Sequence, residues 1–337
     1  MPEVDVLHLS SDDVVRGPTL AAHLTAWAGV DGNRQALAAL IGGIAEASIP
    51  LAARLAQGGL TGDPGAIIGT NQSGDKQKAL DVAAHDHFLD ACCSLSVASF
   101  LSEEAEEVIN IDPNGHFDVA IDPIDGSSNI GIGAPLGVLF CVFPAGESFL
   151  RQGRDVIAAG YVSFGHSIDF GFSVGSGVAI ATFDADSGAF ILDEDSVTIA
   201  DACTSIAFNP SHQRRWTPDL RRYVDDLFLG EDGPRAQDFN MRWIAAAVGD
   251  LHRILRRGGF FMYPGDNRPG HENGFLRLAY EAFPIAYLIE QAGGAATNGS
   301  RPILDLIPNS PHDRVPLFFG AKSEVSKLLD YLSQSDT

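Results

Sequence analysis

The sequence predicts an α/β protein built from two lobes, residues 1–200 and residues 201–337. Three observations favour this fold class. The chain of 337 residues is long enough to bury one large core or two medium ones. Its composition, 45% hydrophobic and 20% charged, is typical of a globular enzyme and argues against disorder. Stretches with helical spacing of apolar residues alternate with short β-like runs along the chain.

The first lobe is expected to open with a helix at residues 34–57, kinked at Pro50 and ended by Gly58-Gly59. Its apolar residues recur at helical spacing: Leu37, Leu40, Ile41, Ile44, Leu51 and Leu55. A second helix is predicted over residues 78–93. Short β-like runs, separated by loops and by Gly and Asp turns, occupy most of residues 94–200 and indicate a sheet.

The second lobe is predicted to begin at Asp201. Residues 241–257 carry an apolar stripe at helical spacing and end in two arginines followed by two glycines, which predicts a helix and its end. A strand at residues 260–263 is cut by Pro264. A further helix at residues 283–292 begins with a proline in its first turn and ends before two glycines.

The formal net charge is −22, from 44 acidic and 22 basic residues. This balance argues against nucleic acid or an anionic membrane surface as a partner. A phosphorylated substrate would approach an acidic protein more easily if bound cations inverted the local field, so the charge mildly favours a metal site. Solubility alone explains the same charge equally well.

The N-terminus and the cysteines predict a cytoplasmic protein. Acidic residues come early, at Glu3 and Asp5, with no apolar segment of a signal peptide, and no uninterrupted apolar run reaches the length of a membrane span. The four cysteines form no C-x-x-C pattern and are expected to be free thiols in a reducing compartment: Cys92, Cys93, Cys141 and Cys203.

The most informative segment follows the apolar run at residues 117–121, which predicts a buried strand. Asp122 leaves the end of that strand, Pro123 is expected to force a turn, and Asp125 returns to the same side. Residues 126–128, Gly-Ser-Ser, offer free N–H groups where a helix could begin. Two carboxylates beside an anion-binding cluster suit a divalent cation and a phosphate together, so the segment predicts metal-assisted phosphate chemistry.

Further carboxylates extend this site to a multi-metal centre, and the set is Asp75, Glu103, Asp122, Asp125 and Glu281. Magnesium prefers octahedral oxygen coordination from a few carboxylates, waters and substrate phosphate. The alternative is that these are ordinary solvated turn acids, and that Glu281 is only a helix N-terminal acid placed near the positive end of the dipole. Glu106 and Glu107 are interpreted as solvated.

Five motifs, in order from about residue 70 to residue 320, resemble class I fructose-1,6-bisphosphatase. They are Asn71-Gln-Ser-Gly-Asp-Lys-Gln-Lys-Ala-Leu-Asp81, Ser102-Glu-Glu104, Asp122-Pro-Ile-Asp-Gly-Ser-Ser-Asn129, Gly274-Phe-Leu-Arg-Leu-Ala-Tyr-Glu281 with Pro284-Ile-Ala-Tyr287 and Glu290-Gln-Ala-Gly-Gly294, and Asp305-Leu-Ile-Pro308 with His312-Asp-Arg-Val-Pro316. A single Asp-x-x-Asp-Gly occurs often by chance, whereas five ordered matches do not.

This resemblance implies the layered sandwich of the sugar phosphatases, with mixed sheets and with helices between and outside them. It also implies Mg²⁺-dependent hydrolysis of the 1-phosphate of fructose 1,6-bisphosphate in a homotetramer, without a covalent enzyme intermediate. Two or more Mg²⁺ per site, with Mn²⁺ able to substitute, would neutralise the phosphate, activate the attacking water and hold it in line with the scissile bond.

The resemblance assigns the metals to Glu103, Asp122, Asp125, Glu281, Asp75 and the backbone carbonyl of Ile124. It implies that Glu104, close to Asp81, handles the proton of the attacking water. Neighbouring carboxylates push one pKa upward, which would suit a base working near neutrality. Alternatively, Asp81 only caps the helix that begins nearby.

The substrate residues implied by the resemblance are Asp125, Gly126, Ser127, Ser128, Asn209, Arg242, Tyr263 and Arg277. Residues 126–128 would hold the transferred phosphoryl group. Arg242 would reach a distal phosphate in a neighbouring subunit's site, where its planar fork suits phosphate. Arg277 could instead make only a structural ion pair.

The chain departs from the family pattern at the distal phosphate. Phe275 stands where the family commonly has a basic residue, and His212 and Trp243 stand where tyrosines are often found. Losing a cation is expected to weaken binding of a second phosphate by about 1–3 kcal/mol, part of which a protonated His212 could recover. Sedoheptulose 1,7-bisphosphate is therefore a natural second substrate. An inositol-phosphate or nucleotide phosphatase of the same superfamily and a silent metabolite-binding homologue are the remaining alternatives.

We expect AMP to inhibit weakly or not at all. AMP-responsive relatives carry a Lys-Tyr pair before the strand that leads to the Asp-rich motif, and this chain has His116-Phe117 there. The N-terminal region also matches their nucleotide-binding helix poorly. A phosphate-release assay with Mg²⁺ and an AMP titration checks this, and inhibition at micromolar AMP would contradict it.

Overall fold

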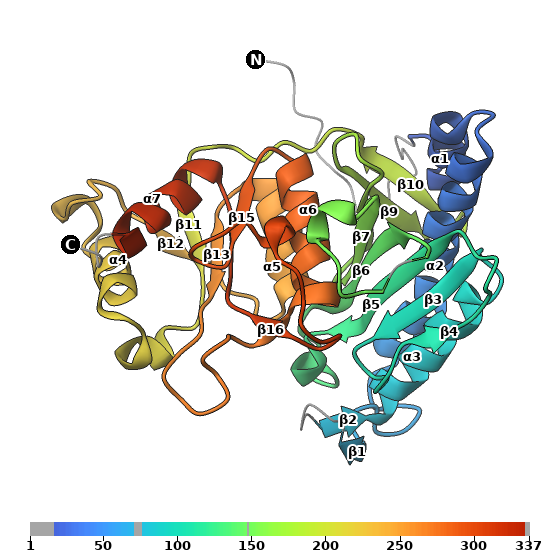
Figure 1. Ribbon diagram of the computed structural model, residues 1–337, viewed down its shortest axis with the longest axis horizontal. Coiled ribbons are helices and arrows are strands. Elements are labelled where there is room, and N and C mark those ends of the chain that lie inside the picture. The colour runs from blue at the N-terminus through green and yellow to red at the C-terminus, as the bar shows by residue number, and fades with distance from the viewer. Residues whose placement is uncertain (1–16, 71–75, 147, 334–337) are drawn as a thin grey trace.

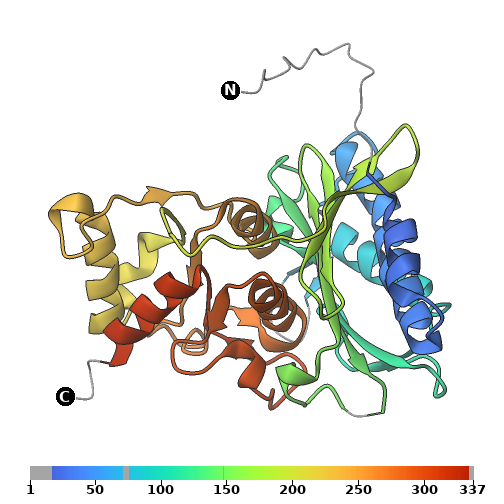
Figure 2. The same ribbon diagram turned by 90° about the horizontal axis from the view of Figure 1, so that it is seen from above.

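The computed structural model describes residues 17–70, 76–146 and 148–333. Seen from above, helices and sheets alternate in layers across the molecule (Figure 2). The first half of the chain forms a large sheet with helices on its outer face, and the second half forms a smaller sheet with helices on its own outer face (Figure 1). Two helices lie between the sheets. The predicted α/β layered sandwich is confirmed.

The strands of the first half are β1 (Ile67–Thr70), β2 (Lys76–Lys78), β3 (Val97–Ser102), β4 (Ile109–Asn110), β5 (Phe117–Asp125), β6 (Leu136–Pro144), β7 (Ala158–Phe164), β8 (Ile168–Ser173), β9 (Ala179–Asp184) and β10 (Ala189–Glu194). β1 and β2 form a separate hairpin, and the other eight make one sheet in the order β10-β9-β8-β7-β6-β5-β3-β4. β3 and β5 pair in parallel, and the remaining neighbours run antiparallel. β5 and β6 are buried along almost their whole length.

The outer face of this sheet is covered by α1 (Leu20–Ala28), α2 (Gly32–Ala56) and α3 (Ala79–Cys92). The predicted helices at 34–57 and 78–93 correspond to α2 and α3, while α1 was not predicted. α2 runs through Pro50 without ending. By length and composition α2 could cross a membrane, but half of its most apolar window is buried inside the protein. Its apolar side chains belong to the core between these helices and the sheet, as in the core helix of a soluble protein.

The second sheet contains β11 (Ser205–Ala207), β12 (Asn240–Met241), β13 (Phe260–Tyr263), β15 (Ala295–Thr297) and β17 (Leu317–Gly320) in the order β12-β11-β13-β17-β15. A small ribbon pairs β14 (Leu276–Arg277) with β16 (Arg314–Val315). α4 (Pro218–Phe228) and α7 (Lys322–Leu332) cover the outer face, where their apolar side chains form a separate core. Neither helix was predicted.

α5 (Ala247–Arg257) and α6 (Phe283–Gln291) fill the layer between the two sheets and supply much of its apolar core. α6 and β13 agree with the predictions at 283–292 and 260–263. The prediction that a helix begins at residue 241 was wrong, because α5 begins at Ala247. Ala245, just before it, has φ +67°, which no α-helix contains.

The expected turn at Pro123 was also wrong. β5 continues through Pro123 to Asp125, and its register with β6 shifts between Asp122 and Asp125. Such a β-bulge places an extra residue in one strand and redirects side chains. A turn and a bulge both bring two nearby carboxylates together, but the bulge keeps them on a buried strand.

Candidate active site

A β-bulge, a parallel strand pair and an irregular helical turn bring four acidic residues together. Asp122 and Asp125 lie at the bulged end of β5 and are 2% and 5% exposed. Glu103 directly follows β3, where its N–H donates to the carbonyl of Ile121 at 3.2 Å. Because β3 and β5 are parallel neighbours, their carboxyl ends meet at one edge of the sheet.

Glu281 reaches the same place from the second half of the chain. It lies in a π-helical turn, Leu278–Ala282, that leads directly into α6, and it is 6% exposed. The N–H of Arg277 donates to its carboxylate at 2.5 Å. Oxygen atoms of Asp122, Asp125 and Glu281 all lie within 4.8 Å of one another. Such π-turns inside helices are frequent at functional sites.

Burial raises the pKa of every carboxyl in this cluster, and repulsion between carboxylates adds to it at Glu103, Asp122 and Glu281. Burial, opposed by Arg277, raises the pKa of Glu103 to about 7. Burial, opposed by the N–H of Val248, raises the pKa of Asp125 to about 6. The pKa values of Asp122 and Glu281 lie well above their ordinary values, first through burial and then through repulsion by Glu103.

These four carboxylates fit a divalent metal centre. They are hard oxygen donors held together in a buried place, which is costly for charges that have no cation. A divalent cation would offset the repulsion that raises their pKa values. Asp75, also predicted as a ligand, lies outside the described residues. Ile124 lines the same space, and its N–H donates to Asp122 Oδ1 at 2.9 Å.

Residues 126–128 follow the bulge as a tight turn. Gly126 has φ +79°, a conformation that L side chains rarely adopt, and a Cβ there would lie 2.5 Å from the Cβ of Ala246. A short 3₁₀ helix, Ser127–Asn129, comes next. The predicted helix start is therefore a single 3₁₀ turn, whose first N–H groups are the kind that bind anions.

Glu104 and Asp81 form a second acidic pair beside the cluster. Burial first, with repulsion by Glu104 as a further cause, raises the pKa of Asp81 to about 6, while the N–H of Lys78 lowers it. That N–H donates to Asp81 Oδ2 at 3.1 Å in the first turn of α3. Asp81 therefore does cap α3, but Oδ1, which is buried, has no hydrogen-bond partner among the residues that the structure describes. A capping role alone leaves this oxygen unexplained.

The hairpin β1–β2 contacts the second acidic pair and the turn at residues 126–128. The Gln77 carboxamide donates to Glu104 Oε2 at 2.7 Å, and the Lys78 ammonium donates to the carbonyl of Ser127 at 2.5 Å. The sequence reasoning missed both residues. Both belong to a short polar segment before α3, and nothing in that segment predicts contacts with residues distant in the sequence.

One cleft of about 510 Å³ joins the acidic cluster, the Gly126 turn and the second half of the chain. Most predicted site residues line it: Glu103, Asp122, Ile124, Asp125, Gly126, Ser127, Ser128, Asn209, Tyr263, Arg277 and Glu281. Arg242 is exposed and donates to the carbonyl of Met241 instead. A cleft of this size is typical of small-molecule sites.

Comparisons with known proteins identify the family. Residues 28–195 match the model of the fructose-1,6-bisphosphatase N-terminal domain, and residues 199–333 match that of the C-terminal domain. The chain belongs to the fructose-1,6-bisphosphatase family. It is 49% identical over 328 residues to the class 1 fructose-1,6-bisphosphatase of Brucella anthropi, covering 97% of this chain and 96% of that protein. The class 1 enzyme of Brucella suis is also 49% identical, over 325 residues, covering 96% of each chain.

Solved fructose-1,6-bisphosphatase structures share the fold. The holo form of the Leishmania major enzyme gives a TM-score of 0.87 at 29% identity, covering 94% of this chain and 99% of that one. Its apo form gives a TM-score of 0.82 at 26% identity, with the same coverage. Membership of this family implies dependence on a divalent metal, in agreement with the carboxylate cluster.

Within this fructose-1,6-bisphosphatase cleft, several lining residues were not predicted as site residues: Trp243, Ala245, Ala246, Ala247, Phe261, Leu276 and Arg314. Arg314 lies on β16 directly opposite Arg277 on β14, a pairing that only the folded structure shows. Two arginines that face each other across a ribbon repel unless anions lie close by. The carboxylate cluster supplies such anions to Arg277, which lowers the pKa values of Glu103 and Glu281.

Phe275, where the family pattern has a basic residue, is part of an aromatic stack. Its ring lies 5.3 Å from that of Tyr263 and 4.5 Å from that of His271, both nearly parallel to it. A smaller pocket of about 90 Å³ adjoins this stack and is lined by Asn209, His212 and Arg268, among others. Arg268 is already paired with Asp266 at 2.6 Å.

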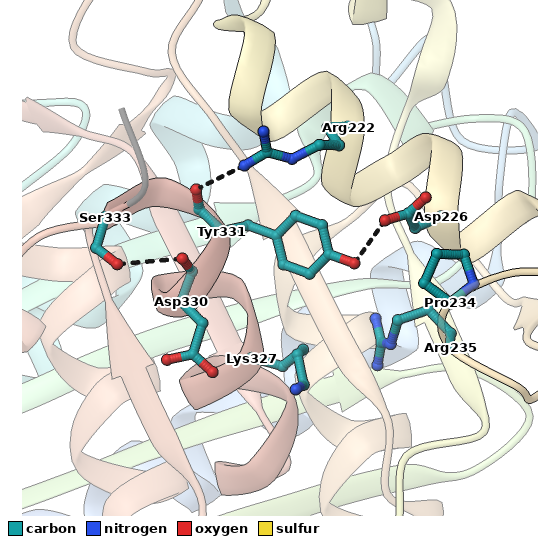
Figure 3. A pocket seen from close by; sticks show the side chains of 8 residues that line it. All are labelled: Arg222, Asp226, Pro234, Arg235, Lys327, Asp330, Tyr331 and Ser333. Atoms are coloured by element: carbon teal, nitrogen blue, oxygen red, sulfur yellow. Dashed lines mark hydrogen bonds between the residues drawn. The ribbon is translucent and has the colours of Figure 1, made fainter. Parts of the chain in front are cut away.

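A larger pocket, of about 690 Å³, lies between α4 and α7, on the outer face of the second sheet (Figure 3). Its cations are Arg222, Arg235 and Lys327. Arg222 pairs with Asp219 and Arg235 with Glu324, while the Tyr331 hydroxyl donates to Asp226 at 2.6 Å. Most of the charges in this pocket are compensated within the protein, whereas the smaller cleft contains the four carboxylates that repel one another.

Proposed function

We propose that this chain hydrolyses the 1-phosphate of fructose 1,6-bisphosphate to give fructose 6-phosphate and phosphate, with Mg²⁺ as its metal. The observation that carries the proposal is the convergence of three buried carboxylates, Asp122, Asp125 and Glu281, with the half-buried Glu103 beside the Gly126 turn in one cleft. Family membership over nearly the whole chain supports the substrate. We further propose two lobes that divide near residue 200, a homotetramer, and a cytoplasmic location, consistent with four free cysteines.

In this proposal Glu103, Asp122, Asp125, Glu281 and the carbonyl of Ile124 hold the cations, together with Asp75. When bound, the cations would neutralise the phosphate and lower the pKa of the attacking water. The N–H groups of residues 126–128 would donate hydrogen bonds to the oxygens of the transferred phosphoryl group and stabilise its negative charge. Arg277 keeps part of the cluster ionised, because its guanidinium lowers the pKa values of Glu103 and Glu281.

Glu104, with Asp81, would take the proton of the attacking water. Gln77 fixes the Glu104 carboxylate through its hydrogen bond of 2.7 Å. Asn209 and Tyr263 line the far end of the cleft and would contact the sugar and its distal phosphate. Arg242, exposed to solvent in one subunit, is free to reach the site of a neighbour, as the family resemblance implies.

Phosphate release from three substrates tests the proposal. Fructose 1,6-bisphosphate should give the highest kcat/KM, with sedoheptulose 1,7-bisphosphate as the second candidate because the distal pocket lacks a cation at Phe275 and Arg268 is neutralised by Asp266. Inositol 1-phosphate should react poorly. A preference for inositol 1-phosphate would contradict the proposal, and no release from any of the three would favour a silent metabolite-binding protein.

Replacing Phe275 by Lys should lower KM for fructose 1,6-bisphosphate by about 5- to 150-fold, the range for a charge-assisted contact worth about 1–3 kcal/mol. The ammonium would stand beside Asn209 and Tyr263, where the second phosphate is expected. Steady-state kinetics measure the change. Phe275→Leu, which removes the ring stack without adding charge, is the matched control. An equal effect of both variants would contradict a role for charge.

A further inference from the structure

The loop between β12 and α5 lines part of the cleft. Ala245, Ala246 and Ala247 all contribute to the lining. The loop is in an unfavourable conformation, because Ala245 has φ +67° and a side chain with a Cβ rarely adopts it. Contacts with residues outside the loop must therefore stabilise this backbone conformation.

Asp250, one turn into α5, provides these contacts. It is 1% exposed, and its two carboxylate oxygens accept the N–H of Ile244 at 3.1 and 3.3 Å. The N–H of Ala245 adds a further hydrogen bond to the same carboxylate. Gly249 makes the fold-back possible, since a Cβ there would lie 2.8 Å from a methyl carbon of Ile244. A buried carboxylate with several N–H donors is a strong anchor.

The other side of the loop touches the catalytic residues directly. The N–H of Val248 donates to Asp125 Oδ2 at 2.7 Å. Ala246 packs against Gly126 so closely that a Cβ on Gly126 would lie 2.5 Å from the Ala246 Cβ. A shift of the loop would therefore move both a metal carboxylate and the turn that receives the phosphate.

We propose that Asp250 is a positioning residue for the metal and phosphate site, acting through residues 244–248 on Asp125 and Gly126. The inference rests on the proposed function and deepens it. Asp250 is not among the site residues predicted from the sequence. An anchor of this kind is expected to affect metal affinity about 10- to 100-fold, as is typical of groups that orient metal ligands.

The test compares Asp250→Ala, Asp250→Asn and Asp250→Ala with Ala245→Gly, all in the full-length chain. Mn²⁺ affinity by titration calorimetry, thermal unfolding, and kcat and KM with fructose 1,6-bisphosphate are measured for each. Asp250→Ala should weaken Mn²⁺ binding about 10- to 100-fold and lower kcat/KM. Asp250→Asn, which keeps one accepting oxygen, should show a smaller shift in the same direction.

Ala245→Gly should restore part of the Mn²⁺ affinity of Asp250→Ala, because glycine adopts a positive φ without penalty. No recovery would overturn the route through the loop. Asp118→Asn is the matched control: Asp118 is equally buried, at 1%, on the same strand as Asp125, and pairs with Arg151 at 2.8 Å. It should lower the melting temperature without changing Mn²⁺ affinity.

Wild-type Mn²⁺ affinity and kcat/KM in a folded Asp250→Ala protein would overturn the proposal. If that variant does not fold, the same outcome in Asp250→Asn overturns it. The measurements also separate this inference from the proposed function. A wild-type protein that binds Mn²⁺ but releases no phosphate from fructose 1,6-bisphosphate would refute the function, while the Mn²⁺ affinities still decide the role of Asp250.

Discussion

Replacing Asp122 by Asn should lower phosphate release from fructose 1,6-bisphosphate by at least about a hundredfold, because the site loses a metal carboxylate at its centre. The shape and the hydrogen bond from Ile124 to Oδ1 are kept. The same variant should make the metal-free protein more stable, by about 1 kcal/mol or more, since it removes one charge from a buried acidic cluster. Phosphate release and thermal unfolding in EDTA measure the two effects.

The sign of the stability effect follows from the pKa values. Folding raises the pKa of Glu103 to about 7 and of Asp125 to about 6, and raises those of Asp122 and Glu281 strongly. Such carboxyls favour the folded state below about pH 4, and this contribution is lost as the pH rises through 6 and 7. The variant should therefore gain most over wild type above pH 7, and little at pH 4.

Glu107→Gln provides the control, because Glu107 lies in the acidic stretch that contains Glu103 but is exposed. It should change neither turnover nor unfolding by more than surface substitutions usually do. Near-normal turnover of Asp122→Asn at saturating Mg²⁺ would show that the metal assignment is wrong. A lower melting temperature of Asp122→Asn in EDTA at pH 8 would show that the cluster is not under electrostatic strain.

The local sequence predicted the chemistry of β5 better than its geometry. Two aspartates after an apolar run, followed by Gly-Ser-Ser, were enough to indicate a metal and a phosphate. The turn expected at Pro123 was wrong because β6 continues to pair on both sides of the irregularity. A strand partner distant in sequence decides between a turn and a bulge, and nothing within residues 117–128 specifies that partner.

The helices show where periodicity suffices and where it fails. α4 carried the signals that predict a helix: Thr217 before Pro218, and Leu220, Tyr223, Val224 and Leu227 on one stripe. It could have been predicted. The start of α5 could not, since Ile244 continues the apolar stripe beyond the helix. The fold-back of that segment onto Asp250 depends on a buried hydrogen bond that periodicity does not register.

The convergence of the site was predictable only through the ordered family motifs. Glu281 is more than 150 residues from Asp122 in the sequence, yet their carboxylate oxygens lie within 4.8 Å of each other. Taken alone, Glu281 is better interpreted as a helix N-terminal acid than as a metal ligand. Apart from the family motifs, no sequence pattern predicts a site role for Gln77, Lys78 or Arg314. Their positions at the site become apparent only in the folded structure, from the β1–β2 hairpin and the β14–β16 ribbon.

Replacing Glu104 by Gln should lower kcat by about 10²- to 10⁴-fold at pH 7.5, the range for removal of a general base, with a much smaller effect on KM. Gln keeps an acceptor for the Gln77 carboxamide, so the hairpin should remain docked. Steady-state phosphate release measures both parameters. The exposed acid Asp90, changed to Asn on the outer side of α3, is the control and should leave kcat unchanged.

Asp81→Asn should act on the pH profile rather than only on the rate. Burial raises the pKa of Asp81 to about 6, so below pH 6 Asp81 is protonated and can no longer accept a proton that Glu104 takes from the attacking water. At saturating Mg²⁺, kcat should therefore fall about tenfold per pH unit below pH 6, and this limb should move to lower pH in Asp81→Asn. Protonation of the metal carboxylates would give a limb in the same range, because the pKa of Asp125 is also about 6. Metal concentration distinguishes the two causes. An acid limb that shifts to lower pH as Mg²⁺ is raised, and that persists in Asp81→Asn, belongs to the metal site. That result would show that Asp81 does not control the proton.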